Sequence, residues 1–137
     1  MKYSRRDLSL LLPALAAATA AAQSNNKKLP SKAYRFEDLP VKGHSRAVLN
    51  GETHSGFPLE LHITQLEPGQ APHPPHHHVH EEVLLLQEGT LDATINGKTT
   101  RVGPGSVIYL ASNDEHGWRN AGDTRAQYFV FALGSDK

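Results

Sequence analysis

The amino-acid sequence predicts an all-β domain, in which short antiparallel strands form a sandwich or a barrel. Two observations carry this prediction. No stretch beyond residue 22 has the apolar periodicity of a long amphipathic helix. Short segments of alternating apolar and polar residues recur instead, separated by glycine, proline and Asn-Gly pairs. The chain has no cysteine, which excludes disulfides, thiolate metal sites and a cysteine nucleophile.

The expected strands follow one another closely along the chain. Residues 59–66 alternate apolar and polar side chains and end at a Pro-Gly turn. Residues 91–95 also alternate, and the following Asn96-Gly97 pair is typical of a type I′ turn. The other expected strands cover residues 34–36, 45–49, 82–88, 98–102, 106–110 and 125–133. Because no repeat or change of composition divides them, we expect one domain over residues 32–137.

Residues 1–22 have the pattern of an export signal. A pair of arginines, Arg5-Arg6, precedes an alanine-rich stretch that is short for a membrane span and is interrupted by Pro13. Small residues favour cleavage after Ala22. The paired arginines resemble a twin-arginine signal, with a general secretory signal or an uncleaved surface helix as alternatives. We expect a periplasmic or secreted protein, with no stable membrane anchor after cleavage and a flexible lead-in over residues 23–31.

The charge balance argues against a nucleic-acid partner. The chain carries 14 Lys and Arg residues against 14 Asp and Glu residues, so its formal net charge is zero. It has no basic stripe and no platform of arginine and aromatic residues of the kind that binds nucleic acid. We therefore expect no nucleic acid to bind, and the histidines point to a small-molecule substrate or ligand instead.

Histidines are concentrated between residues 73 and 80, where five of the nine occur. Neutral imidazole is a common metal ligand, and a carboxylate adds an oxygen donor. On one extended strand His76, His78 and Glu82 would share a face, because side chains alternate. A histidine tract alone can be compositional and disordered. This tract runs directly into the apolar residues 83–86, a buried-strand signal, which places it on a folded wall.

Two separated motifs in this chain resemble the conserved motifs of the cupin family. The first reads His76-x-His78, three residues, Glu82, six residues, Gly89. The second reads Gly105, five residues, Ala111-x-Asn113, two residues, His116, three residues, Asn120. The resemblance covers residues 59–133, and the spacing between the motifs is typical of a small single-domain cupin.

The resemblance implies a double-stranded β-helix, or jelly-roll barrel, that holds a divalent metal ion near its centre. The metal ligands that it implies are His76, His78, Glu82 and His116. Two positions depart from the second motif, where the family usually has Pro for Ala111 and Gly for Asn113. Asparagine tolerates a left-handed backbone, so the turn before the last ligand can survive, although loss of the proline should loosen it slightly.

Nitrogen and oxygen donors suit iron, manganese, nickel, cobalt, copper or zinc, and the sequence does not choose among them. Four protein ligands on an octahedral ion leave two positions for a small organic oxygen donor. We expect a metalloenzyme, dioxygenase-like first and an isomerase or lyase second, with Glu82 as the catalytic base. No second acid is clearly placed, because Glu88 is the only other carboxylate expected on the ligand face of its strand. The alternative is a cupin that binds a metal or small ligand without turnover.

The other aromatic and histidine side chains are less constrained by the sequence. His80 shares the parity of the ligands, but a chain reversal just before it would turn it toward solvent or toward a supporting role. His73 and His77 are expected at the rim. Trp118 shares parity with His116 and either faces the cavity or packs in the core. Surface or satisfied core positions are expected for His44, His54 and His62. Open sheet edges leave a homodimer as a compatible assembly.

Overall fold

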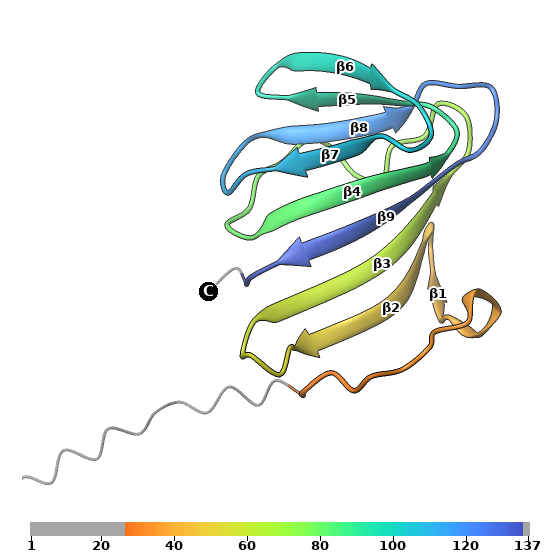
Figure 1. Cartoon of the computed structure of the whole chain (residues 1–137). Helices are drawn as coiled ribbons and strands as arrows, with labels where there is room; N and C mark the ends of the chain where they lie inside the picture. The colour runs from red at the N-terminus through yellow and green to blue at the C-terminus, as the bar shows by residue number, and fades with distance from the viewer. Residues whose placement is uncertain (1–26, 136–137) are drawn as a thin grey trace, which may run out of the picture.

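The computed structural model describes residues 27–135, which form two antiparallel β-sheets (Figure 1). The larger sheet has the strand order β1-β2-β3-β9-β4-β7, and the smaller sheet has the order β6-β5-β8. The strands are β1 (Val41–Lys42), β2 (Ser45–Glu52), β3 (Pro58–Leu66), β4 (Glu81–Glu88), β5 (Leu91–Ile95), β6 (Lys98–Val102), β7 (Val107–Leu110), β8 (His116–Asn120) and β9 (Ala126–Leu133). The predicted signal, residues 1–22, lies outside the described residues. No helix among residues 27–135 is long and apolar enough to cross a membrane.

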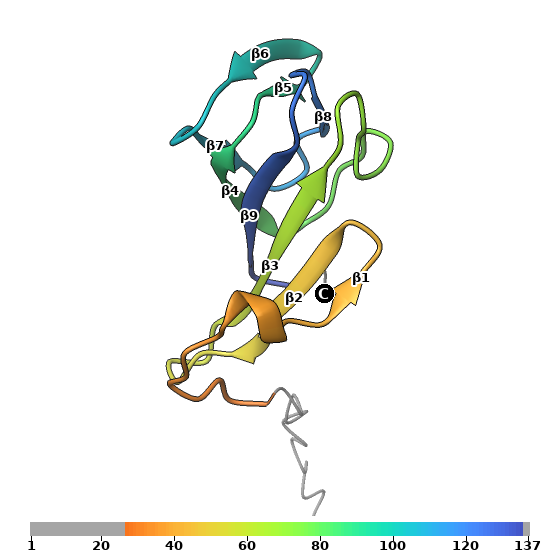
Figure 2. The ribbon, with the colours of Figure 1, turned by 90° about the vertical axis from the view of Figure 1, so that its right-hand side faces the viewer.

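The two sheets close into a barrel at one end of the molecule. Seen from the side, β5, β6 and β8 lie across from β4, β7 and β9, while β1 and β2 extend beyond the barrel (Figure 2). Alternation along β4 and β9 gives the barrel its interior, because Leu84 and Val130 are register partners and both are buried. The all-β prediction is confirmed, and the paired sheets fit a double-stranded β-helix.

The core fills the space between the sheets. Leu84, Leu86, Leu91 and Leu110 are at most 1% exposed, which makes leucine its main component. The other members of this buried cluster are Leu66, Ala93, Ile108, Trp118, Ala126, Tyr128 and Val130. Burial of apolar surface on this scale is the main stabilising contribution to the fold.

Two turns depend on residues that tolerate a positive φ angle. Asn96 and Gly97 have φ angles of 47° and 79°, which confirms the predicted type I′ turn between β5 and β6. Gly89 ends β4 with a φ angle of 86°, and a Cβ atom at this position would lie 2.5 Å from the Cα atom of Ala126. Only glycine fits there, because both the backbone angle and the close approach exclude a side chain.

The N-terminal part of the described chain differs from the prediction. The strand expected at residues 34–36 is wrong, because Phe36–Asp38 form a short 3-10 helix, η1. Its turn is closed by two backbone hydrogen bonds. The Asp38 nitrogen donates to the Arg35 carbonyl oxygen, and the Leu39 nitrogen donates to the Phe36 carbonyl oxygen. Within the predicted lead-in, Lys28 forms a parallel bridge with Glu52 of β2. Strand β8 was not among the expected strands, because its residues do not alternate simply between apolar and polar.

Candidate metal centre

Two segments that are distant in sequence meet at the histidine run. The backbones of His76 and His116 exchange two hydrogen bonds, of 3.0 and 2.8 Å, and so join the loop before β4 to β8. The prediction that His76 and His78 share the strand of Glu82 is wrong, because β4 begins only at Glu81. Pro74 and Pro75 directly precede His76 and lack the N–H groups that would extend its pairing with β8 into a longer ladder. His76 therefore pairs with β8 as an isolated bridge.

The loop that carries His78 is fixed by the turn before β8. The backbone nitrogen of Asn113 donates to the His78 carbonyl oxygen at 2.8 Å. Asn113 has a φ angle of 64°, so this asparagine takes the left-handed conformation that was expected at its position. The turn stays closed without the family's proline, because the Asp114 backbone nitrogen donates to the Ala111 carbonyl oxygen at 3.2 Å.

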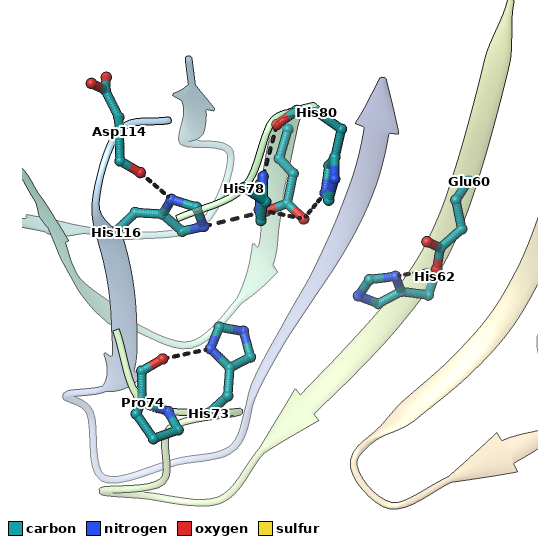
Figure 3. A network of polar contacts seen from close by, with 9 residues as sticks. Glu60, His62, His73, Pro74, His78, His80, Asp114 and His116 are labelled. Carbon is teal, nitrogen blue, oxygen red and sulfur yellow. Dashed lines mark hydrogen bonds and ion pairs between the residues drawn. The ribbon is translucent and has the colours of Figure 1, made fainter. Parts of the chain in front are cut away.

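Backbone carbonyls orient two of the imidazole rings (Figure 3). The Nδ1 atom of His78 lies 2.7 Å from the His80 carbonyl oxygen, and the Nδ1 atom of His116 lies 2.8 Å from that of Asp114. A carbonyl oxygen can only accept, so each Nδ1 carries the proton. The neutral ring then keeps its lone pair on Nε2, the form in which imidazole binds a metal ion.

The ring nitrogens and the Glu82 carboxylate converge on one region of the barrel. One ring nitrogen from each of His76, His78 and His116 lies within 4.8 Å of the other two. Glu82 reaches the same place, with Oε1 3.5 Å from His78 Nε2 and Oε2 3.9 Å from His116 Nε2. Adjacent donors on an ion with bonds of about 2.1 Å are separated by about 3 Å, so small adjustments would bring these atoms to a common ion.

The unpaired atoms at this cluster are themselves evidence for a missing partner. His76 Nδ1, His78 Nε2 and His116 Nε2 are buried and have no hydrogen-bond partner among the described residues. Each unsatisfied buried polar atom costs about 1–3 kcal/mol. Burial, followed by repulsion from His73 and the other imidazoles, lowers the pKa of His76 and favours its neutral form. A divalent cation would satisfy the lone pairs on His78 Nε2 and His116 Nε2, and one ring nitrogen of His76 lies close to both, so the residues present fit such an ion.

His80 contacts the carboxylate ligand. Its Nε2 atom lies 3.3 Å from Glu82 Oε1, and its ring stacks on that of His78 with the centroids 3.6 Å apart and an angle of 8° between planes. His78, His80 and Glu82 also form a second group of donors that lie within 4.8 Å of one another. His80 therefore either supports Glu82 or shares an ion with it and His78. His73 and His77 are exposed, as expected of rim residues.

Glu88 does not lie on the ligand face of its strand, as its parity predicted. A β-bulge between Leu86 and Glu88 makes Glu88 the register partner of Gln127, on the outer face of the sheet. The extra residue reverses the alternation, which a prediction from parity cannot anticipate. Among the described residues, Glu82 is therefore the only buried acidic side chain.

Two aromatic residues complete the interior next to the cluster. The Trp118 ring lies parallel to that of His116, with the centroids 5.9 Å apart, so it both faces the cluster and packs in the core. Its Nε1–H group donates to the Tyr128 hydroxyl at 2.7 Å. Burial raises the pKa of Tyr128 to about 12, so this phenol is neutral at physiological pH.

Sequence reasoning missed one polar pair on the face that carries Glu82. Glu60 and Glu82 both have Ala132 as a register partner, on opposite sides of β9, so all three side chains share a face. His62 Nδ1 lies 3.1 Å from Glu60 Oε1 (Figure 3). The alternation of apolar and polar residues in β3 was the available signal.

Comparison with known proteins agrees with the fold. Residues 62–132, more than half of the chain, match the family described as "Cupin domain". A search of curated proteins gave no match. Among solved structures, a cupin-family protein with a double-stranded β-helix fold from Methanocaldococcus jannaschii has a TM-score of 0.63 at 17% identity, covering 77% of this chain and 93% of that chain.

Two similar structures are enzymes by description. A polyketide cyclase from Streptomyces resistomycificus has a TM-score of 0.61 at 19% identity, covering 77% of this chain and 81% of that chain. A sugar phosphate isomerase of the cupin superfamily from Silicibacter pomeroyi has a TM-score of 0.61 at 14% identity, covering 76% of each. At these identities the likeness establishes the fold alone. With its domain match, its two-sheet barrel and both motifs, this chain belongs to the cupin family.

Proposed function

We propose that this cupin binds a divalent transition metal ion and acts on a small organic oxygen donor. The proposed ligands are His76, His78, Glu82 and His116. The observation that carries this proposal is the set of three buried ring nitrogens without a partner, beside a buried carboxylate. Folded proteins rarely leave buried polar atoms unpaired, and one nitrogen from each of these three rings lies close to the other two, as metal coordination requires.

The donor set restricts the chemistry without fixing the metal. Three imidazoles and one carboxylate suit iron, manganese, nickel, cobalt, copper or zinc. When bound, such an ion supplies Lewis acidity and, with four protein ligands, open positions for a bidentate oxygen substrate such as a phenol or diketone. We favour oxygenation of that substrate first, and isomerisation or lyase chemistry second.

Glu82 is the residue proposed to move the proton. As the only buried acid among residues 27–135, it is the one carboxylate next to the ligand nitrogens that water does not surround. Its Oε1 atom is held near His80, which leaves Oε2 on the side of His116. His78 and His116 each donate a hydrogen bond from Nδ1–H to a backbone carbonyl oxygen, so neither ring is placed to exchange a proton with the substrate.

A non-catalytic ligand-binding cupin is the second candidate, and one observation favours it. The interior polar groups next to the cluster are already paired, since the Trp118 indole donates to the Tyr128 hydroxyl and Thr64 bonds to Ser45. A pocket with few polar groups aimed at a substrate is suited to binding. Glu82 remains the group that distinguishes the two candidates, because catalysis needs a base and binding does not.

Metal analysis of paired variants tests the ligand assignment. His76→Ala combined with His116→Ala should abolish stoichiometric metal in the purified protein. His54→Ala combined with His77→Ala removes the same number of imidazoles from exposed positions and should leave the metal content unchanged. Full retention of metal by the first variant would refute the assignment.

An oxygen-consumption screen over phenols and diketones, with Glu82→Gln as the inactive control, then separates an oxygenase from a binding protein.

We also propose that the chain is exported and cleaved after Ala22, leaving a periplasmic or secreted protein. The twin-arginine-like residues and the alanine-rich stretch support this proposal. Mass spectrometry of the protein purified from its own host should give an N-terminus at Gln23. An intact Met1 in cytoplasmic material would contradict it.

A further inference from the structure

A second candidate site lies on the outer face of the larger sheet, away from the metal cluster. It is a groove of about 540 Å³ between residues 34–39 and strands β2, β3, β4 and β9. The register places it outside the barrel, because the lining residues Gln65 and Gln127 alternate with Thr64 and Tyr128, which are buried in the interior. A volume of this size is typical of a small-molecule site.

The walls of the groove are apolar and aromatic. Leu39 and Ile63 line it and are 8% and 5% exposed, which makes them a largely buried floor. Phe36 from η1 and Phe129 from β9 also line it. A flat, partly apolar molecule is what such surfaces accommodate.

Three glutamine side chains form a polar band across the groove. Gln65 donates to the Gln127 carboxamide, and Gln127 donates to Gln87 at 2.6 Å. Each carboxamide both donates and accepts, so a chain of three leaves a donor at one end and an acceptor at the other, whichever way it runs. Arg125 and Glu88 also line the groove and form an ion pair at 3.1 Å, so these two charges cancel.

Arg46 is the charge in the groove that nothing neutralises. Its guanidinium lies over the Phe36 ring, 4.5 Å from the centroid, and its NH1 atom donates weakly to the Leu39 carbonyl oxygen at 3.4 Å. Its Nε atom is buried and has no hydrogen-bond partner among the described residues. None of the ion pairs found within residues 27–135 includes Arg46. A partly buried guanidinium without an anion is unfavourable unless a ligand supplies one.

We propose that this groove binds a small planar organic monocarboxylate. The carboxylate pairs with the Arg46 guanidinium, and the ring lies between Phe36 and Phe129. Polar substituents of the ligand meet the glutamine band. The net positive charge of the groove selects an anion, and its aromatic lining favours a flat one. This site is separate from the metal cluster and does not depend on the proposed reaction.

Benzoate and its neutral analogue benzamide test the proposal by calorimetry on the purified full chain, treated with a chelator so that no metal can bind the carboxylate. Benzoate should bind, and benzamide should bind at least about tenfold more weakly, since a charged hydrogen-bonded contact is worth about that factor. Arg46→Met keeps the apolar stem and should lose the same factor. Arg101→Met removes an arginine from the opposite sheet, and His116→Ala alters the metal cluster; both should bind benzoate as the unchanged protein does.

If Arg46→Met does not fold, two-dimensional NMR of the unchanged protein decides the same question. Benzoate should shift the side-chain amide signals of Gln87 and Gln127 and leave the backbone signals of His78 and Glu82 in place. The proposal is overturned by absence of binding at about 10 mM benzoate, by equal affinity for benzamide, or by loss of binding in His116→Ala alone. It is also overturned if sedimentation shows a dimer that Arg46→Met separates, because a second copy would then occupy the groove.

Discussion

Alkaline pH should destabilise the fold through Tyr128. This side chain is 1% exposed, and burial raises its pKa to about 12 from an ordinary value of 10.0. Because the pKa is raised in the folded state, the stability linked to this group is complete below pH 10 and is lost as the pH rises toward 12. A difference of about two pH units corresponds to about 3 kcal/mol, of which about half is lost by pH 11.

Urea denaturation followed by Trp118 fluorescence, from about pH 8 to pH 11, measures this loss. The matched variant is Tyr128→Phe, which cannot titrate. It should start about 1–3 kcal/mol less stable, because the Trp118 indole loses its buried acceptor. The difference between the two proteins should then shrink as the pH rises, since only the tyrosine loses stability by ionising.

Tyr109 provides the control for an exposed phenol. A hydrogen bond to Glu81 raises its pKa, but its ring is 54% exposed. Tyr109→Phe should therefore keep the pH dependence of the unchanged protein. A constant stability difference between the unchanged protein and Tyr128→Phe from pH 8 to pH 11 would refute the reasoning, because it would mean that the buried phenol does not resist ionisation.

Three further predictions follow from packing, backbone geometry and proton competition. Leu84→Ala should lower the unfolding free energy by about 2–5 kcal/mol, and Leu85→Ala, 38% exposed, by much less, as measured in urea. Gly89→Ala should destabilise the fold by at least about 1 kcal/mol more than Gly69→Ala. Both glycines have a positive φ angle, but only at Gly89 would the added Cβ atom clash with backbone atoms. Equal losses of stability would contradict this. Bound metal should be released under acid, because protons compete with the metal ion for the lone pairs of the ligands, as followed by dialysis and elemental analysis; unchanged metal content at about pH 4 would point to another site.

The sequence predicted those features of the fold that depend only on a few neighbouring residues. Asn96-Gly97 closes the predicted hairpin, and the alternation of residues 59–66 matches β3. The all-β class followed from the repetition of such signals. The segment at residues 34–36 failed because an aromatic-rich stretch has strand propensity, whereas a 3-10 turn formed in its place at Phe36–Asp38.

At the candidate site, the sequence named residues that the structure brings close together, but it did not predict their arrangement. Parity along one strand was the stated reason for grouping His76 with Glu82, yet the loop reaches the cluster by pairing with β8. Glu88 was misplaced because a bulge adds one residue, and a single-residue shift exchanges the faces of a strand. The roles of Arg46 and Tyr128 depend on tertiary contacts with Phe36, Leu39 and Trp118, which lie on other elements and which no pattern within one strand contains.

The bridge between His76 and His116 has a consequence for the order of folding. These residues lie on either side of a long intervening segment that forms β4, β5, β6 and β7, and the backbone bonds between them require the two sheets to have closed. Contacts of such separation form late, because the chain must first lose the entropy of the loop between them. The candidate site should thus be absent from partly folded chains and should become able to capture metal only at the last stage of folding.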